Sequence, residues 1–271
     1  MTRERITTNA YEFILLIIIV LCLIGIVIKS AYADDQAMMN AAIMRRNDII
    51  QSSIYVEQVG HNNVYDIGSE GTRNMLAGLG SNAMNIQGDW NTITTRQGNF
   101  ANTFGKNLIE ANLYGYYNSV NLKQGQGPND LGGHMQSIVI AGDNNALTTE
   151  QRNSSSYGHY LSTNITGNNN TQNINQSGNA IKQMFVTTTG NNNNVSALQD
   201  GLGAHEISMI INGNSNDAVV TQTGNTKNSA SIILTNAGSP ASITLNQTGG
   251  QTYSIDRLCS TLCGRVIVTQ P

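Results

Sequence analysis

Short segments in which apolar and polar residues alternate make up most of this chain, and clusters of glycine and asparagine separate them. In residues 242–247, for example, Ile243 and Leu245 alternate with three hydrophilic residues. A period of two predicts a β-strand with one buried face and one exposed face. On the strands that follow the clusters, the expected inward residues are Ile93, Thr95, Val120, Leu122, Leu147, Thr149, Gln172, Ile174, Val195, Ala197, Ala218, Val220, Ile243 and Leu245.

The segments that precede the clusters show the same alternation. Two such strands joined by a tight turn would fold over and bury their apolar faces against each other, so the repeating unit is predicted to be strand, turn and strand. The expected inward residues of this second set are Ile138, Ile140, Leu161, Ile165, Met184, Val186, Ile207, Met209, Ile211, Ile232 and Leu234.

All the units share one register. In seven of them a glycine is followed nine residues later by a glutamine, and an eighth begins at Gly60 with Ser69 in place of the glutamine. Successive glycines lie 23 to 28 residues apart, a period typical of a solenoid. The seven pairs are Gly88/Gln97, Gly115/Gln124, Gly142/Gln151, Gly167/Gln176, Gly190/Gln199, Gly213/Gln222 and Gly238/Gln247.

An asparagine stands three residues after almost every turn glycine, and Ala241 is the exception. Sequences such as GDNN (142–145) and GNNN (167–170) concentrate the residues that best tolerate positive φ, so each G-x-x-N segment predicts a tight turn. The asparagines at this position are Asn63, Asn91, Asn118, Asn145, Asn170, Asn193 and Asn216.

One unit alone would be marginally stable in water, so the units are expected to stack. Stacked equivalent strands lie about 4.8 Å apart, which brings identical side chains together in columns. Buried amides in a column can form hydrogen-bonded ladders, whereas an unpaired buried amide costs about 1–3 kcal/mol. The predicted fold is an all-β solenoid with two strands in each of about nine rungs. Its glutamine ladder is predicted to contain Gln58, Gln97, Gln124, Gln151, Gln176, Gln199, Gln222, Gln247 and Gln270.

The amino-acid composition argues against several classes of function. Of 271 residues, 37 are Asn and 17 are Gln, only 11% are charged, and the net charge is −3. Because no basic patch exists, nucleic acid is not an expected partner. The four histidines (His61, His134, His159 and His205) are expected in solvated loops, with no carboxylate or nucleophile in a matching rung position. The sequence therefore predicts no enzyme and no cofactor or metal site.

The N-terminus precedes the repeats. Residues 13–28 are an apolar run between Arg3/Arg5 and Ala31-Tyr32-Ala33, so 1–33 are predicted to be a secretory signal peptide, with an uncleaved N-terminal anchor as the alternative. Residues 34–51 would form a loosely helical or disordered leader, and 52–271 the repeat domain. Cys259 and Cys263 could close a short disulfide in an oxidising compartment, or remain thiols.

Within the repeats, residues 52–63 (SSIYVEQVGHNN) match the pattern S-x5-Q-x-G-x-x-N through Ser52, Gln58, Gly60 and Asn63. Later units match N-x5-Q, and in the ending RVIVTQ (265–270) the final Gln270 lies 23 residues after Gln247. In these features the chain resembles the curlin family. The resemblance implies export across the outer membrane of a Gram-negative bacterium, and polymerisation with itself and with other curli-type subunits into extracellular amyloid fibres of the biofilm matrix.

Two functions remain open at this stage. The first is a secreted structural subunit that self-assembles into fibres through the strand edges of its terminal rungs. The second is a β-solenoid adhesin, or a surface or virion spike, that does not polymerise and is anchored by its N-terminus.

Overall fold

The computed structural model describes residues 37, 39–41, 43, 44, 46, 53–69, 74–77, 84–98, 106–125, 130–152, 158–236, 240–259 and 264–271. The chain divides into two units, Met1–Ala42 and Ile43–Pro271. The residues described between 37 and 46 are helical, which is one of the two states predicted for the leader. The predicted signal segment lies outside the described residues.

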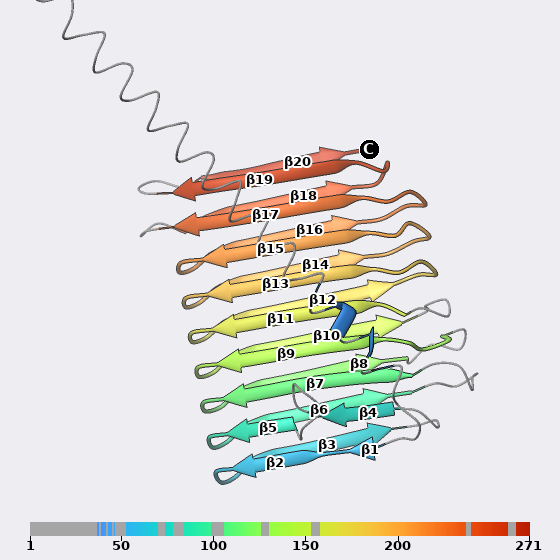
Figure 1. Ribbon diagram of the computed structural model, residues 1–271. Coiled ribbons are helices and arrows are strands. Elements are labelled where there is room, and N and C mark those ends of the chain that lie inside the picture. Colours follow the sequence, from blue (N-terminus) through green and yellow to red (C-terminus); the bar gives the residue numbers. More distant parts are fainter. Residues whose placement is uncertain are drawn as a thin grey trace, which may run out of the picture. The chain divides into compact units, whose positions relative to one another are not determined.

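Parallel strands of the second unit form two sheets, which alternate along the chain (Figure 1). Sheet A contains β1 (Ser53–Ile54), β2 (Val56–Val59), β4 (Asn74–Ala77), β5 (Met84–Gln87), β7 (Asn107–Tyr114), β9 (Met135–Ala141), β11 (Tyr160–Thr166), β13 (Gln183–Thr189), β15 (Glu206–Asn212), β17 (Ser229–Asn236) and β19 (Thr252–Cys259). Sheet B contains β3 (Val64–Ser69), β6 (Thr92–Gln97), β8 (Ser119–Gln124), β10 (Ala146–Arg152), β12 (Thr171–Ser177), β14 (Asn194–Gln199), β16 (Asp217–Gln222), β18 (Ser242–Gln247) and β20 (Arg265–Gln270).

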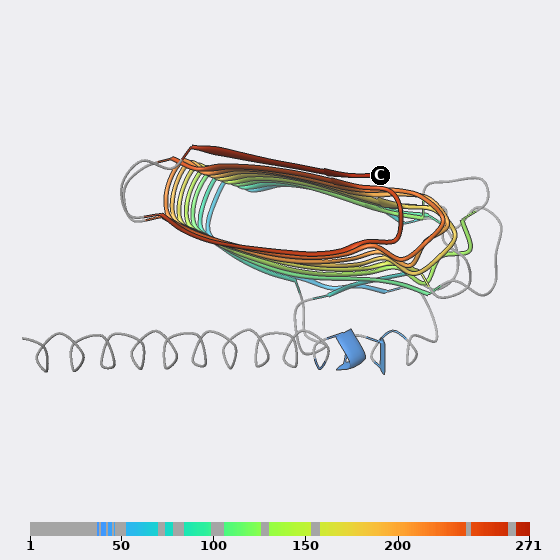
Figure 2. The same ribbon diagram turned by 90° about the horizontal axis from the view of Figure 1, so that it is seen from above.

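Each rung contributes one strand to sheet B, whose nine strands follow in chain order from β3 to β20. Viewed along the stack, successive rungs superimpose as one flattened coil with the two sheets as its long sides (Figure 2). Consecutive strands of sheet B pair in register, so that Gln97 lies opposite Gln124 and Gln247 opposite Gln270. The expectation of a β-solenoid with two strands in each rung is confirmed.

The predicted alternation is visible in the burial of the strands. In β16 and β18, every second side chain is buried and the others are partly exposed. All the residues that the sequence placed inward on the two sets of strands are buried. Most of the apolar ones form one continuous cluster between the sheets. Because each fully buried Ile, Leu or Val side chain contributes about 1.5–3 kcal/mol, this cluster is the main source of stability.

The G-x-x-N turns have one conformation throughout. Seven of the eight predicted turn glycines have φ between 119° and 133°, and Gly238 lies outside the described residues. The residue two positions later is left-handed in each of these seven turns, with φ between 55° and 61°. Asparagine tolerates this conformation best and occupies it in four turns, whereas Trp90 and Tyr117 occupy it in two. The glycines also allow close stacking, since a Cβ atom on Gly167 would overlap the carbonyl oxygen of Gly190.

We expect Gly167→Ala to destabilise the fold by about 3 kcal/mol or more, because it combines a left-handed φ of 121° with backbone overlap. Urea unfolding would measure the change. Gly264→Ala is the matched control, since a Cβ there meets no atom within 4 Å, and its effect should stay within about 0.5 kcal/mol. Equal effects of the two substitutions would contradict this account of the turns.

Candidate functional site

An uninterrupted glutamine ladder runs through the core along sheet B. Each side-chain Nε2 donates to the Oε1 of the glutamine on the next rung toward the C-terminus. Seven such bonds, of 2.8–3.1 Å, join Gln97, Gln124, Gln151, Gln176, Gln199, Gln222, Gln247 and Gln270.

The ladder also ties the two sheets together. The second N–H of each central glutamine crosses the core to a carbonyl at the start of a sheet A strand, as in Gln151 to Met135 O at 3.1 Å and Gln176 to Tyr160 O at 3.0 Å. An amide buried in this way donates twice and accepts once, so it has no unpaired hydrogen. The glutamines therefore occupy buried positions without the desolvation cost that a lone amide would carry.

A second ladder runs along the turns, with the opposite donor direction. Asn145 Nδ2 donates to Asn118 Oδ1 of the preceding rung at 3.1 Å, and its other hydrogen goes to Gly167 O of the following rung at 2.8 Å. The backbone N–H of Asn145 also donates to Asn118 Oδ1, at 3.0 Å. The same pattern links Asn91, Asn118, Asn145, Asn170, Asn193 and Asn216, and Asn63 joins it through its bonds to Gly88 O and Asn91 N.

The prediction of Gln58 as a member of the glutamine ladder was wrong, and Asn236 of the asparagine ladder was not predicted. Gln58 lies on β2 of sheet A, exposed and opposite Ile86, and its Nε2 bonds to Gly60 O. The residue beside it in the column is aliphatic, so Gln58 does not join an amide ladder. At the other end, Ala241 cannot extend the asparagine ladder. Asn236, from the end of β17, takes that place by donating to Asn216 Oδ1.

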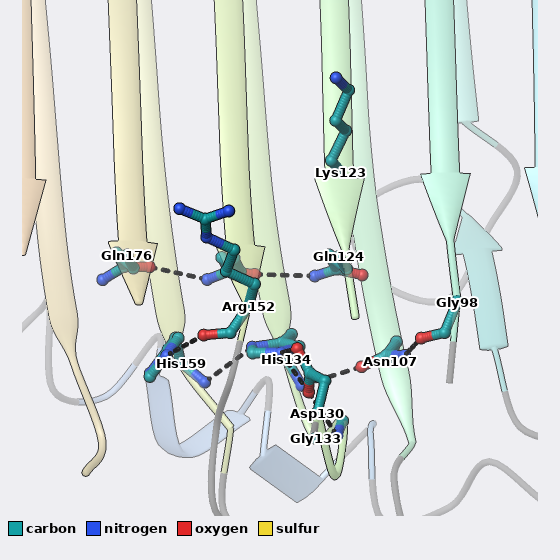
Figure 3. A network of polar contacts seen from close by, with 12 residues as sticks. Gly98, Asn107, Lys123, Gln124, Asp130, Gly133, His134, Arg152, His159 and Gln176 are labelled. Atoms are coloured by element: carbon teal, nitrogen blue, oxygen red, sulfur yellow. Dashed lines mark hydrogen bonds and ion pairs between the residues drawn. The ribbon is translucent and has the colours of Figure 1, made fainter. Parts of the chain in front are cut away.

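A third column of polar side chains was not predicted. It lies where the chain enters the sheet A strands and contains Asn107, His134, His159, Lys182, His205 and Asn228, which we call the strand-entry column. Figure 3 shows its Asn107, His134 and His159 beside the glutamine ladder. All six residues are buried.

Histidine and asparagine form the same two bonds in this column. An acceptor atom receives a backbone N–H from the next rung: Asn107 Oδ1 from His134 N and His134 Nδ1 from His159 N, both at 3.1 Å (Figure 3). His159 Nδ1 likewise accepts from Lys182 N at 3.2 Å. A donor atom on the other side of the ring or amide bonds within its own rung, as in His159 Nε2 to Arg152 O at 3.1 Å and Asn228 Nδ2 to Thr223 O at 2.8 Å. The imidazoles therefore act as neutral Nε2–H tautomers.

Burial sets the proton affinities in this column. It lowers the pKa of His159 well below the ordinary value, with added repulsion from His134 and Lys182. Burial also lowers the pKa of His205. The ammonium of Lys182 donates to the carbonyls of Ala180, Gly201 and Gly203, yet burial lowers its pKa to about 8.

The expectation of solvated loop histidines was wrong for His134, His159 and His205 and correct for His61, whose side chain is 88% exposed. The Nδ1 atoms of these rings accept backbone N–H groups from the next rung, which neighbours in the sequence do not show. The Nε2 partners lie in the same rung, and the expectation of no matching carboxylate was wrong for His134, whose Nε2 lies 3.0 Å from both carboxylate oxygens of Asp130. The signal was nevertheless present. Linked members of the strand-entry column lie 23–27 residues apart, as the turn glycines do.

The remaining predictions concern the two cysteines and the N-terminal segment. Cys263 is outside the described residues and nothing is described of the Cys259 side chain, so their disulfide stays a prediction. Among the residues that the structure describes, no helix is long and apolar enough to cross a membrane.

The core is incompletely covered in the two end rungs. Most inward apolar residues of the central rungs are 0–2% exposed. By contrast, the inward residues Tyr65 and Ile67 of the first rung, and Val266 and Val268 of the last, are only partly buried. In β20 the side chains alternate between exposed and half-buried rather than between half-buried and buried.

Fold and site together define a β-solenoid of parallel rungs held by polar ladders. No protein-family model, curated protein or solved structure matches the chain.

We expect Gln176→Ala to destabilise the protein by about 2–5 kcal/mol. The substitution leaves the Nε2 of Gln151, the Oε1 of Gln199 and the Tyr160 carbonyl without their bonds in a buried site. The control is Gln87→Ala, since that side chain is exposed at the end of β5, and its effect should stay within about 0.5 kcal/mol. Chemical unfolding of both variants tests this, and a neutral Gln176→Ala would refute the structural role of the ladder.

Proposed function

We propose that this protein is a structural subunit that assembles end to end into fibres, with a further copy of itself stacking on each end rung. The observation that carries this proposal is the partial burial of the inward residues of the first and last rungs. A second copy in the same register would complete the burial of Tyr65 and Ile67 at one end and of Val266 and Val268 at the other.

Backbone and side-chain patterns support the same assembly. Among the described strands, the outermost ones of sheet B, β3 and β20, each pair with one neighbour. Parallel strands with an unpaired edge are templates for another strand. The glutamine ladder reaches the last rung through the 3.0 Å bond from Gln247 to Gln270. A stacked copy would therefore find both its hydrophobic columns and a ladder amide in register.

The curlin-like pattern supports an assembly outside the cell. On this proposal the protein is secreted by a Gram-negative bacterium through outer-membrane machinery. It polymerises with itself and with other curli-type subunits into an amyloid fibre of the biofilm matrix and adheres to surfaces. Nothing in this role requires catalysis or a cofactor.

A second candidate is the non-polymerising, anchored adhesin, and one observation favours it. Trp90 and Tyr117 occupy the left-handed turn position, which is costly for bulky residues, although both rings are more than half exposed. The two rings are nearly parallel, with centroids 6.2 Å apart. An exposed aromatic pair at a strained position fits a ligand-binding surface better than a role in stability.

We expect Val268→Glu to slow fibre elongation by at least about tenfold, because end-to-end stacking would bury an unpaired carboxylate in the core column. Seeded growth followed by thioflavin T, with negative-stain microscopy of the products, would measure this.

Ile267→Glu is the matched control. It adds the same charge one residue away, but Ile267 faces outward and is 58% exposed, so it remains in solvent after stacking. Normal elongation of Val268→Glu would exclude this end as the interface. Discrete, non-elongating particles from the unmodified protein would instead favour the adhesin.

A further inference from the structure

We propose that His159 and His205 are proton-binding sites through which mild acid loosens the stacking of the rungs along the strand-entry column. The inference concerns the fold of each subunit and holds whether or not the protein forms fibres. It rests on the hydrogen bonds of the two imidazoles, on their neighbours in the column, and on the asparagines that occupy equivalent positions.

The geometry leaves no room for a second proton on either ring. Nε2 is the donor in each case, to Arg152 O at 3.1 Å from His159 and to Asp200 O at 2.8 Å from His205. Nδ1 is the acceptor, for the backbone N–H of Lys182 and of Asn228 respectively, both at 3.2 Å. A proton on Nδ1 would face another donor, so protonation removes the bond that joins one rung to the next.

The neighbours of the imidazoles add to this effect. The His134 and His159 ring centroids are 5.0 Å apart, and Lys182 and His205 occupy the next two rungs. Four consecutive rungs thus carry a basic group in one buried column. Imidazolium ions would be added to a column that already holds the Lys182 ammonium at neutral pH, and like charges at this spacing repel.

Few groups offset that charge. Asp130 bonds to His134 rather than to His159 or His205, with both carboxylate oxygens 3.0 Å from Nε2. Asp200 favours protonation of His205, whereas Lys182 opposes it. The charged and titratable groups around the two rings are Arg46 (bonded to Gly133 O), Asp130, His134, Arg152, Lys182 and Asp200.

The direction of the pH effect follows from the lowered pKa values. Histidine in the unfolded chain takes up a proton near its ordinary pKa of 6.5, whereas His159 and His205 in the fold do so only at lower pH. Well above pH 6.5 these two histidines are neutral in both the folded and the unfolded chain, so they add no pH dependence to the stability there. As the pH falls below 6.5 toward the lowered values, the folded-to-unfolded ratio decreases by up to about tenfold per pH unit for each histidine.

The chain itself supplies the variant that tests this inference. Asn107 and Asn228 occupy the same column and form equivalent bonds without titrating. In the full chain, His159→Asn with His205→Asn should keep the fold at pH 7.5. It should also remove up to about a hundredfold per pH unit of the acid dependence between about pH 5 and 6.5. Urea unfolding across that range gives the folded-to-unfolded ratio directly.

His61→Asn is the control, because His61 is a solvent-exposed turn residue, and its acid profile should match that of the unmodified protein. An unchanged acid profile in the double variant would overturn the proposal. If that variant does not fold, ¹⁵N NMR of the unmodified protein still decides. Nδ1 of His159 and His205 must be unprotonated at pH 7.5, and its protonation must coincide with faster hydrogen exchange of the Lys182 and Asn228 amides. Retention of a folded, slowly exchanging column after both rings are protonated would contradict the inference.

Discussion

In-register parallel stacking is the constraint on which the rest of this structure depends. Once Gln124 lies opposite Gln151, every other position of those rungs is also fixed against its counterpart. A side chain then adjoins its equivalents above and below at about the strand spacing of 4.8 Å. The chemistry of a column, rather than of a single residue, therefore decides whether a position is stable. Aliphatic columns form the core, and polar columns are satisfied only when they continue from rung to rung.

The polar columns satisfy their buried hydrogen-bond donors and acceptors in different ways. Glutamines donate toward the C-terminus and use their second hydrogen across the core, whereas asparagines donate to both neighbouring rungs. In the strand-entry column, imidazole replaces an amide because it too has one donor and one acceptor on opposite sides. That equivalence lasts only while the ring is neutral. Histidine thus adds a sensitivity to protons that Asn107 and Asn228 lack at equivalent positions.

At each end of the described stack, a rung has a neighbouring rung on one side only. A column that ends leaves its last residue half covered, as at Tyr65 and Val268. In the proposed assembly, another copy in register would cover these residues. This is why the two ends of the stack, rather than a pocket or a charged surface, carry the proposed assembly.

The sequence alone determined the strands, the turns and most of the two amide ladders. Period-two alternation and the Gly-x-x-Asn spacing are local signals, and both recur in register. Ile243 and Leu245 could be assigned to the core, and Gly167 to a left-handed turn, without any coordinates. Those assignments depend only on residues within a single unit and on its repeat length.

Only the tertiary structure decided the roles of His159, Asn236 and Gln58. Each role depends on which residue lies in the adjacent rung, at least 20 positions away in the chain. His159 can be buried because a neighbouring rung donates the backbone N–H of Lys182 to its Nδ1. Asn236 replaces the amide that Ala241 lacks. Gln58 has the residue type of a ladder member but adjoins Ile86 in sheet A. Hydrogen-bond partners between rungs are set by stacking, and no single unit of sequence contains them.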